Sequence, residues 1–188
     1  EVDGDGDKSL VEFLWPADAK GTKLLTWAHY HRNDEQWLFL PALNRIKRIS
    51  ATNQSGSFMG SEFSYEDISG EEVEKFTHYF IQDDEYDGRP VWVIERFPND
   101  KKSGYSKQIV YLDKEYKRSL RVDYYDRKGE LLKISHFHLY KKVDRWWRFH
   151  EIEVKNVQTK KSSILRWKQL KLGNNVSKML FMKDNLLN

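Results

Sequence analysis

Three histidines stand where imidazoles could bind a metal ion. His136 and His138 lie two residues apart in a segment of alternating polarity, which places both side chains on one face of a predicted strand. His150 falls in the next predicted strand, and three imidazoles could bind zinc. A solvent-facing polar stripe that also holds Lys141 and Arg148 explains the same residues, and the sequence favours it. We expect no metal and no cofactor.

The aspartates and glycines at residues 3–7 suggest a calcium loop. An EF-hand loop that begins at Asp3 needs glycine at its sixth position and glutamate at its twelfth. Those positions hold Lys8 and Leu14, so the pattern fails. The run instead predicts a polar turn at the tip of a hairpin.

Candidate nucleophiles and acids are few. Ser55, Ser57 and Ser61 lie beside glycines, but none stands in the Gly-x-Ser-x-Gly turn that exposes a catalytic serine. The acidic triplet at residues 83–85 precedes a turn glycine and is typical of a solvated loop. The sequence holds no glycine-rich phosphate loop. We therefore expect no catalytic residues and predict that the protein is not an enzyme.

The composition further limits the classes of protein to which the chain can belong. The 188 residues favour one domain. A net charge of +3, from 32 Lys and Arg against 29 Asp and Glu, is weaker than a dedicated nucleic-acid binder needs. With no cysteine, neither a disulfide nor a thiolate metal site can form. No apolar stretch reaches the ~18 residues of a membrane span.

Apolar and polar residues alternate along most of the chain, which predicts antiparallel strands. Residues 89–97 are apolar on both faces and are expected inside a sheet, after a hairpin turn at Asp87 and Gly88. Residues 50–70 predict a loop with short helical turns, and residues 176–187 predict a terminal helix. The expected strands cover residues 9–15, 22–31, 36–40, 45–49, 76–82, 89–97, 106–112, 119–126, 130–141, 146–158 and 162–170.

A sheet of about ten strands must curl or divide into two layers. A curled sheet of this size can enclose one apolar ligand. The fold class predicted from the residues is therefore mainly β, with one curved antiparallel sheet.

Two runs carry a resemblance to a known family: QWLFLPALNRIKRI at residues 36–49 and GSFMGSEFSYED at residues 56–67. The runs PADAKGTKLL at residues 16–25 and YYDRKGELLK at residues 124–133 fit the same pattern. Over nearly its whole length, the chain resembles the LolA-like outer membrane lipoprotein-sorting protein family. The resemblance implies an incomplete, half-open β-barrel with short helical lid segments. It also implies export to the periplasm, binding of acyl chains in the concave cavity and partnership with RND-type membrane transporters.

The family pattern also includes a signal peptide, a first helix and a leading strand before the turn at residues 3–7. We therefore expect residues 1–188 to form a single LolA-like domain that lacks this helix and strand. An uncovered apolar face tends to recruit a partner. A second copy of the chain, in a homodimer, is one expected source of the missing cover.

The expected ligand is a lipid or an acylated lipoprotein, held reversibly, because burial of an acyl chain gains about 0.8 kcal/mol per CH₂. Arg48 is expected to hold a headgroup or a carbonyl at the rim. Phe58, Met59 and Phe63 are expected to form a movable lid, since methionine adapts to irregular contacts. A closed core without a ligand would use the same wall residues. The expected cavity wall consists of Trp37, Phe39, Trp92, Ile94, Leu120, Val122 and Tyr124.

The alternative function is a protein-interaction module. The sheet would then be a scaffold, and residues 50–70 would dock an RND-type transporter. Substitutions at Phe58 and Met59 separate the two hypotheses, because they would abolish lipid binding in the first and complex formation in the second.

Overall fold

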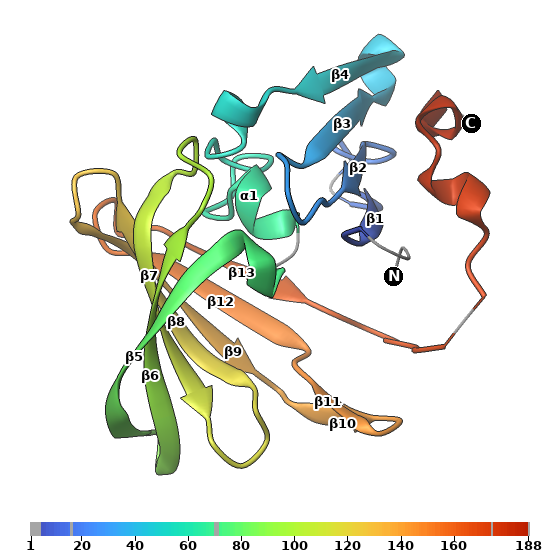
Figure 1. The fold of residues 1–188 in the computed structure, drawn as a ribbon. Helices are drawn as coiled ribbons and strands as arrows, with labels where there is room; N and C mark the ends of the chain where they lie inside the picture. Colours follow the sequence, from blue (N-terminus) through green and yellow to red (C-terminus); the bar gives the residue numbers. More distant parts are fainter. Residues whose placement is uncertain (1–4, 16, 70–71, 174, 188) are drawn as a thin grey trace.

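The computed structural model describes residues 5–15, 17–69, 72–173 and 175–187, which form antiparallel sheets joined by short loops (Figure 1). The predicted turn at residues 3–7 lies partly outside these residues. A four-stranded sheet has the order β1-β2-β3-β4, and a seven-stranded sheet has the order β13-β12-β9-β8-β7-β6-β5. The strands of the small sheet are β1 (Lys8–Glu12), β2 (Lys23–Trp27), β3 (Glu35–Leu40) and β4 (Arg45–Ile49).

The large sheet is a meander of antiparallel neighbours. Its first hairpin turns at Asp87 and Gly88, whose φ values of 53° and 69° are the left-handed conformations that a tight two-residue hairpin needs. This turn was predicted correctly. The strands are β5 (Phe76–Tyr86), β6 (Arg89–Pro98), β7 (Tyr105–Asp113), β8 (Ser119–Asp126), β9 (Leu131–His138), β12 (Glu151–Asn156) and β13 (Ser162–Arg166).

The helical elements are short, and two of them lie where the loop was predicted. Residues 50–69 hold the 3₁₀-helix η2 (Ala51–Asn53) and the helix α1 (Tyr65–Ile68), and η3 (Val73–Lys75) leads into β5. The 3₁₀-helix η1 (Pro41–Leu43) joins β3 to β4. In Figure 1, α1 lies between the small sheet and one end of the large sheet.

Together the curved sheets form an incomplete barrel, and this fold class is confirmed. Hydrophobic cores lie on both sides of the small sheet. Leu24, Leu38 and Ile49 pack with Phe58 and with Val154 of the large sheet. Leu25, Trp37 and Phe39 pack on the opposite side with Leu186. Within the described ranges, no helix has the length and apolar character needed to cross a membrane.

The predicted terminal helix is wrong. Residues 176–187 instead form two 3₁₀-helices, η4 (Lys178–Phe181) and η5 (Lys183–Leu187), separated by Met182 in extended conformation. Val176, Met179 and Leu180, which defined the helical pattern, are exposed. Phe181 and Leu186 pack against the small sheet instead, and their five-residue separation does not match one face of an α-helix.

The predicted strand at residues 146–158 is also interrupted. β11 (Trp146–Arg148) pairs with β10 (Lys141–Val143) in a separate two-stranded hairpin, and β12 begins only at Glu151. At the break, the Phe149 ring packs edge-on against Phe137 and Trp167, with ring centroids 5.2 and 5.1 Å away. We attribute the interruption to this inward packing of Phe149.

Candidate functional site

The inner face of the large sheet is the face that meets α1 and the small sheet, and it carries Val122, Lys133 and Val154. Side chains alternate between the two faces along each strand, so the cross-strand register defines rows of inner-face neighbours. One row is polar and runs Arg96, Gln108, Tyr124 and Lys133 over β6 to β9. The adjacent row is apolar and runs Phe80, Ile94, Val110 and Val122 over β5 to β8.

Asp67 of α1 fixes this helix to the polar row. Its carboxylate accepts hydrogen bonds from the Lys133 ammonium at 2.5 Å and from the Tyr105 hydroxyl at 2.7 Å. The Lys133 side chain is only 4% exposed, and its second acceptor is the Glu62 carbonyl at 3.0 Å. Burial raises the pKa of Tyr105 well above its ordinary value, and the neighbouring Asp67 charge acts in the same direction. Tyr105 therefore stays a neutral donor.

Ser64 and Glu66 position the rest of the helix. Ser64 is the N-cap, and its hydroxyl accepts from the Asp67 N–H at 3.1 Å while the Asp67 carboxylate accepts from the Ser64 N–H at 2.7 Å. This reciprocal pair is a capping box. Glu66 accepts hydrogen bonds from the Ser103 hydroxyl and the Gly104 N–H. Burial raises the pKa of Glu66 above its usual value in spite of these bonds.

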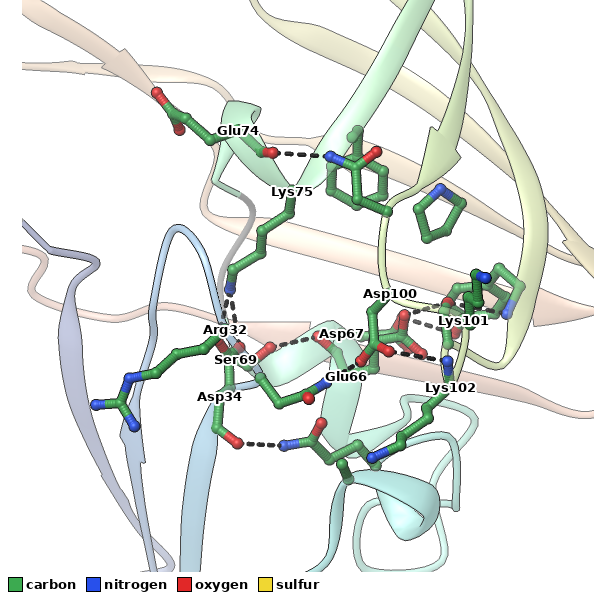
Figure 2. Close-up of a pocket in the computed structure, with 18 of the residues that line it drawn as sticks. Arg32, Asp34, Glu66, Asp67, Ser69, Glu74, Lys75, Asp100, Lys101 and Lys102 are labelled. Atoms are coloured by element: carbon green, nitrogen blue, oxygen red, sulfur yellow. Dashed lines mark hydrogen bonds and ion pairs between the residues drawn. The ribbon is translucent and has the colours of Figure 1, made fainter.

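A polar pocket of about 610 Å³ opens between α1, the β2–β3 turn and the β6–β7 loop. Figure 2 shows Lys75 reaching across to Asp34, and its ammonium lies 2.8 Å from both carboxylate oxygens. Gln54 donates to the Asp34 carbonyl at 3.0 Å. Both charge signs line the pocket, so it offers donors and acceptors to a polar group. Its charged lining residues are Arg32, Asp34, Glu66, Asp67, Glu74, Lys75, Asp100, Lys101 and Lys102.

The polar pocket adjoins the apolar row. Gln108 and Tyr124 line the pocket, and Val110 and Val122 are the next inward residues on the same strands, about 7 Å further along. The row becomes more exposed toward the open edge of the sheet, from Val122 at 0% to Phe80 at 63%. A polar pocket and an apolar strip thus share one face of the sheet.

Four of the expected wall residues come together on the inner face. Ile94 packs with Val122 and Tyr124, and Trp92 shares their face by alternation along β6. Leu120 differs: it packs with Val91 and neighbours on the opposite, outer face. The register shifts between the Tyr111 and Leu112 pairings and leaves Leu120 as the extra residue of a bulge.

The remaining expected site residues lie elsewhere. Trp37 and Phe39 are buried on the far side of the small sheet, against Leu186. Phe58 and Phe63 are each 7% exposed and pack in the core between the two sheets, while Met59 is 38% exposed with a φ of 50°. A ligand-binding role for these residues stays a prediction.

Arg48 lines a second hollow. This hollow, of about 480 Å³, lies beside the β2–β3 turn and shares Arg32 and Asp34 with the polar pocket. The Arg48 side chain is 66% exposed, and its guanidinium lies 3.1 Å from the Glu35 carboxylate. Its partner is a carboxylate, and a headgroup-binding role for Arg48 at the rim of the apolar cavity stays a prediction.

Sequence reasoning missed the anchors Asp67, Lys133 and Tyr105. The Ser64-x-x-Asp67 spacing was a usable capping signal for a helix start. Nothing in the pattern singled out Lys133, which stands between two apolar residues. Leu24 and Leu38, which face the large sheet, were also missed because their strands are apolar on both faces.

His136 and His138 share a face as expected. The rings of His136 and His138 stack with centroids 6.0 Å apart, and the Tyr86 hydroxyl lies 2.8 Å from His136 Nδ1. His150 Nδ1 lies 3.1 Å from the Arg148 carbonyl. Burial lowers the pKa of His136, and the nearby Arg121 charge lowers it further. Among the residues described, no group of three His, Asp or Glu side chains could hold a metal ion.

The architecture places the chain in the class of half-open antiparallel β-barrels to which LolA superfamily proteins belong. A LolA superfamily protein from Nitrosomonas europaea superimposes with a TM-score of 0.78 over 95% of this chain and 78% of that chain, at 20% identity. At this identity the likeness shows the fold alone. No curated protein matches the chain.

The chain belongs to the LolA-like outer membrane lipoprotein-sorting protein family. It is 47% identical, with a TM-score of 0.97, to a Vibrio parahaemolyticus domain provisionally named an outer membrane lipoprotein-sorting protein domain, over 100% of this chain and 80% of that one. It is 31% identical to a DUF1329 family protein from Desulfovibrio piger, with a TM-score of 0.92, over 95% of this chain and 76% of that chain. A family model described as an uncharacterized protein matches residues 5–188. The expected family is confirmed.

Proposed function

We propose that this protein binds the acyl chain of a lipid or lipoprotein in the periplasm and carries it without catalysing a reaction. The observation that supports this function is the apolar row Phe80, Ile94, Val110 and Val122, which runs from the buried core to the open edge of the inner face. The name of the Vibrio parahaemolyticus relative also points to lipoprotein sorting.

The proposed ligand is amphipathic. Its acyl chain lies along the apolar row, over Ile94 and Trp92, and each buried CH₂ contributes about 0.8 kcal/mol. Its polar end reaches the pocket beside Gln108, where the lining residues Lys101 and Lys102 can meet an anionic group. Reversible transport needs only such a site, and no reacting group.

Substitution of Ile94 tests the proposal. Ile94→Glu places a carboxylate on the partly exposed apolar strip, while Ile164→Glu places the same group on the outer face of β13, where Ile164 is 48% exposed. Loss of a buried aliphatic contact, at roughly 1.5–3 kcal/mol, corresponds to about 10-fold or more in affinity. We expect Ile94→Glu to weaken binding of a fluorescent fatty acid by at least that factor, and Ile164→Glu to leave it unchanged.

Native mass spectrometry of the purified protein is the second measurement. We expect a co-purified acyl species that the Ile94→Glu variant lacks. If the wild-type protein carries no such species and binds no fluorescent fatty acid after delipidation, the proposed carrier function is wrong.

A protein-interaction module is the second candidate function. The edge strand β5 favours it, because Tyr79, Phe80 and Ile81 are 56%, 63% and 47% exposed on a strand with an open side. Such an edge can pair with a strand of a partner. The partner would be an RND-type transporter or a second copy of this chain. Under this alternative, Ile94→Glu leaves function intact and changes on β5 abolish it.

A further inference from the structure

The β10–β11 hairpin (residues 141–148) is a separate projection from the large sheet. Its two strands pair only with each other, through Lys141 with Arg148, Lys142 with Trp147 and Val143 with Trp146. Figure 1 shows it extending beyond the ends of β9 and β12, away from α1 and the small sheet. The hairpin therefore lies apart from the polar pocket.

Large apolar side chains on this hairpin face solvent. Trp146 is 50% exposed, Trp147 is 37% exposed, and Leu139 just before the hairpin is 57% exposed. The Trp147 ring packs against Tyr116, with centroids 5.1 Å apart, and the Arg118 guanidinium lies 5.1 Å from its centroid. Tyr116 and Arg118 thus hold the Trp147 ring in place, while Trp146, beside the turn of the hairpin, is more exposed.

Positive charge surrounds these tryptophans. Lys141, Lys142, Arg145 and Arg148 are all exposed, and Asp144 is the single acid of the hairpin. In the described part of the chain, none of the four cations lies within 4.0 Å of a carboxylate, so they are available to an external anion. Four positive charges and one negative give +3 for the hairpin, which equals the net charge of the whole chain.

We propose that the β10–β11 hairpin docks the protein onto an anionic phospholipid surface. Tryptophan favours the membrane interface, where its apolar ring and its N–H are both accommodated. Lysine and arginine near the surface are attracted to anionic headgroups, and this attraction weakens with salt. An acidic protein surface would use the same four cations, so vesicles that contain no protein distinguish the two partners.

This inference goes beyond the proposed carrier function and does not depend on it. Docking concerns the hairpin and the surface of a bilayer, whereas carriage concerns single acyl chains on the inner face. The two proposals can fail separately, because the Ile94→Glu variant keeps the hairpin and the hairpin variants keep the inner face.

Vesicle sedimentation tests the docking site. We expect the wild-type protein to sediment with vesicles of phosphatidylglycerol and phosphatidylcholine at low salt, but not with phosphatidylcholine alone, and to be released by high salt. The double variant Lys141→Glu/Lys142→Glu and the single variant Trp146→Ala should each lower binding by about 10-fold or more, which is a loss of roughly 1.4 kcal/mol.

Matched controls exist in the same chain. Lys160→Glu/Lys161→Glu makes the same charge change in the exposed β12–β13 turn, and Trp15→Ala removes a tryptophan that is 80% exposed elsewhere. Both controls should bind vesicles like the wild type. All four variants should bind a soluble fluorescent fatty acid like the wild type.

Two results would overturn the docking site. If the wild-type protein does not sediment with anionic vesicles, the hairpin is not a membrane contact, and an acidic protein becomes its expected partner. If Lys160→Glu/Lys161→Glu weakens vesicle binding as much as Lys141→Glu/Lys142→Glu, the attraction is one of net charge and not of this hairpin.

Discussion

Folding raises the pKa of the Glu66 carboxyl, which lines the polar pocket. Desolvation is the largest influence and raises its pKa, and the negative charges of Asp67 and Asp100 act in the same direction. The hydrogen bonds from Ser103 and Gly104 oppose this shift without cancelling it. The folded protein therefore keeps the Glu66 proton to a higher pH than the unfolded chain does.

Glu66→Gln is expected to make the protein more stable near neutral pH. Between the unfolded and folded pKa values of Glu66, the folded state binds more protons, so stability falls as pH rises through this window. The neutral amide of the substituted side chain avoids that loss: its oxygen can accept from the Gly104 N–H, and its NH₂ can donate to the Ser103 hydroxyl, which is able to accept. Urea denaturation over a pH series should show the advantage of the variant shrinking as pH falls through the folded pKa.

A matched control is Glu74→Gln, which changes an exposed carboxyl on the same pocket. The account of Glu66 is wrong if its variant gains no stability near neutral pH, or if the gain grows as the solution becomes more acidic.

Individual contacts of this kind could not be predicted from the sequence. Alternation placed Lys133 in a strand but could not say that its ammonium would be buried against Asp67, 66 residues earlier. Trp37 and Phe39 were expected beside the ligand because alternation does not tell which face of their strand points toward the cavity. Their strand is buried on both faces, and only the packing of Leu186 shows which face points away.

At the scale of elements, Asp67 supplies the buried ion pair that helps to hold α1 on the large sheet. Asp67→Asn would leave the Lys133 ammonium buried without a carboxylate partner, with only neutral oxygens such as the Glu62 carbonyl to accept from it. Breaking one partner of a buried ion pair costs about 3–5 kcal/mol. We expect a loss of this size in the free energy of unfolding, measured by urea denaturation, and faster amide exchange over residues 50–69.

Asp83→Asn provides the comparison for this pair. Asp83 and Lys114 are also 2.5 Å apart, but the Asp83 side chain is 66% exposed, and exposed pairs contribute about 0–1 kcal/mol. Equal losses from Asp67→Asn and Asp83→Asn would mean that burial does not strengthen the anchor.

Most elements could be predicted because local patterns determine them. Period-two alternation identified the strands, and Asp87-Gly88 identified a turn that needs positive φ. The terminal segment could not be predicted in this way. Its conformation follows from docking Phe181 and Leu186 onto the small sheet, where the Trp27 indole N–H donates to the Phe181 carbonyl at 2.8 Å. The sequence pattern alone pointed to an α-helix.

At the scale of the whole molecule, the open barrel could be predicted from the sequence, but its division into two sheets could not. Strand number and the family resemblance indicated a curved sheet, and the structure confirms a half-open barrel. The separation into sheets of four and seven strands depends on residues 50–69, whose Phe58 and Phe63 fill the space between the sheets. That packing is a tertiary property without a local sequence signal.

The strand β5 is an open edge of the large sheet, and we predict that two copies of the chain pair through it. An antiparallel pair centred on Ile81 would place the acids at residues 83–85 opposite residues 77–79 of the other copy, so no like charges face each other. Such a contact is isologous and closes as a dimer. Sedimentation velocity over a concentration series should show this dimer. Ile81→Lys would bring two ammonium groups together at the two-fold axis and weaken the dimer by about 10-fold or more.

Ile164→Lys is the control. It alters the opposite edge strand, where the isoleucine is similarly exposed at 48%, and should leave association unchanged. A wild-type protein that stays monomeric at every concentration would show that the bulge between Phe80 and Gln82 is enough to block pairing at this edge.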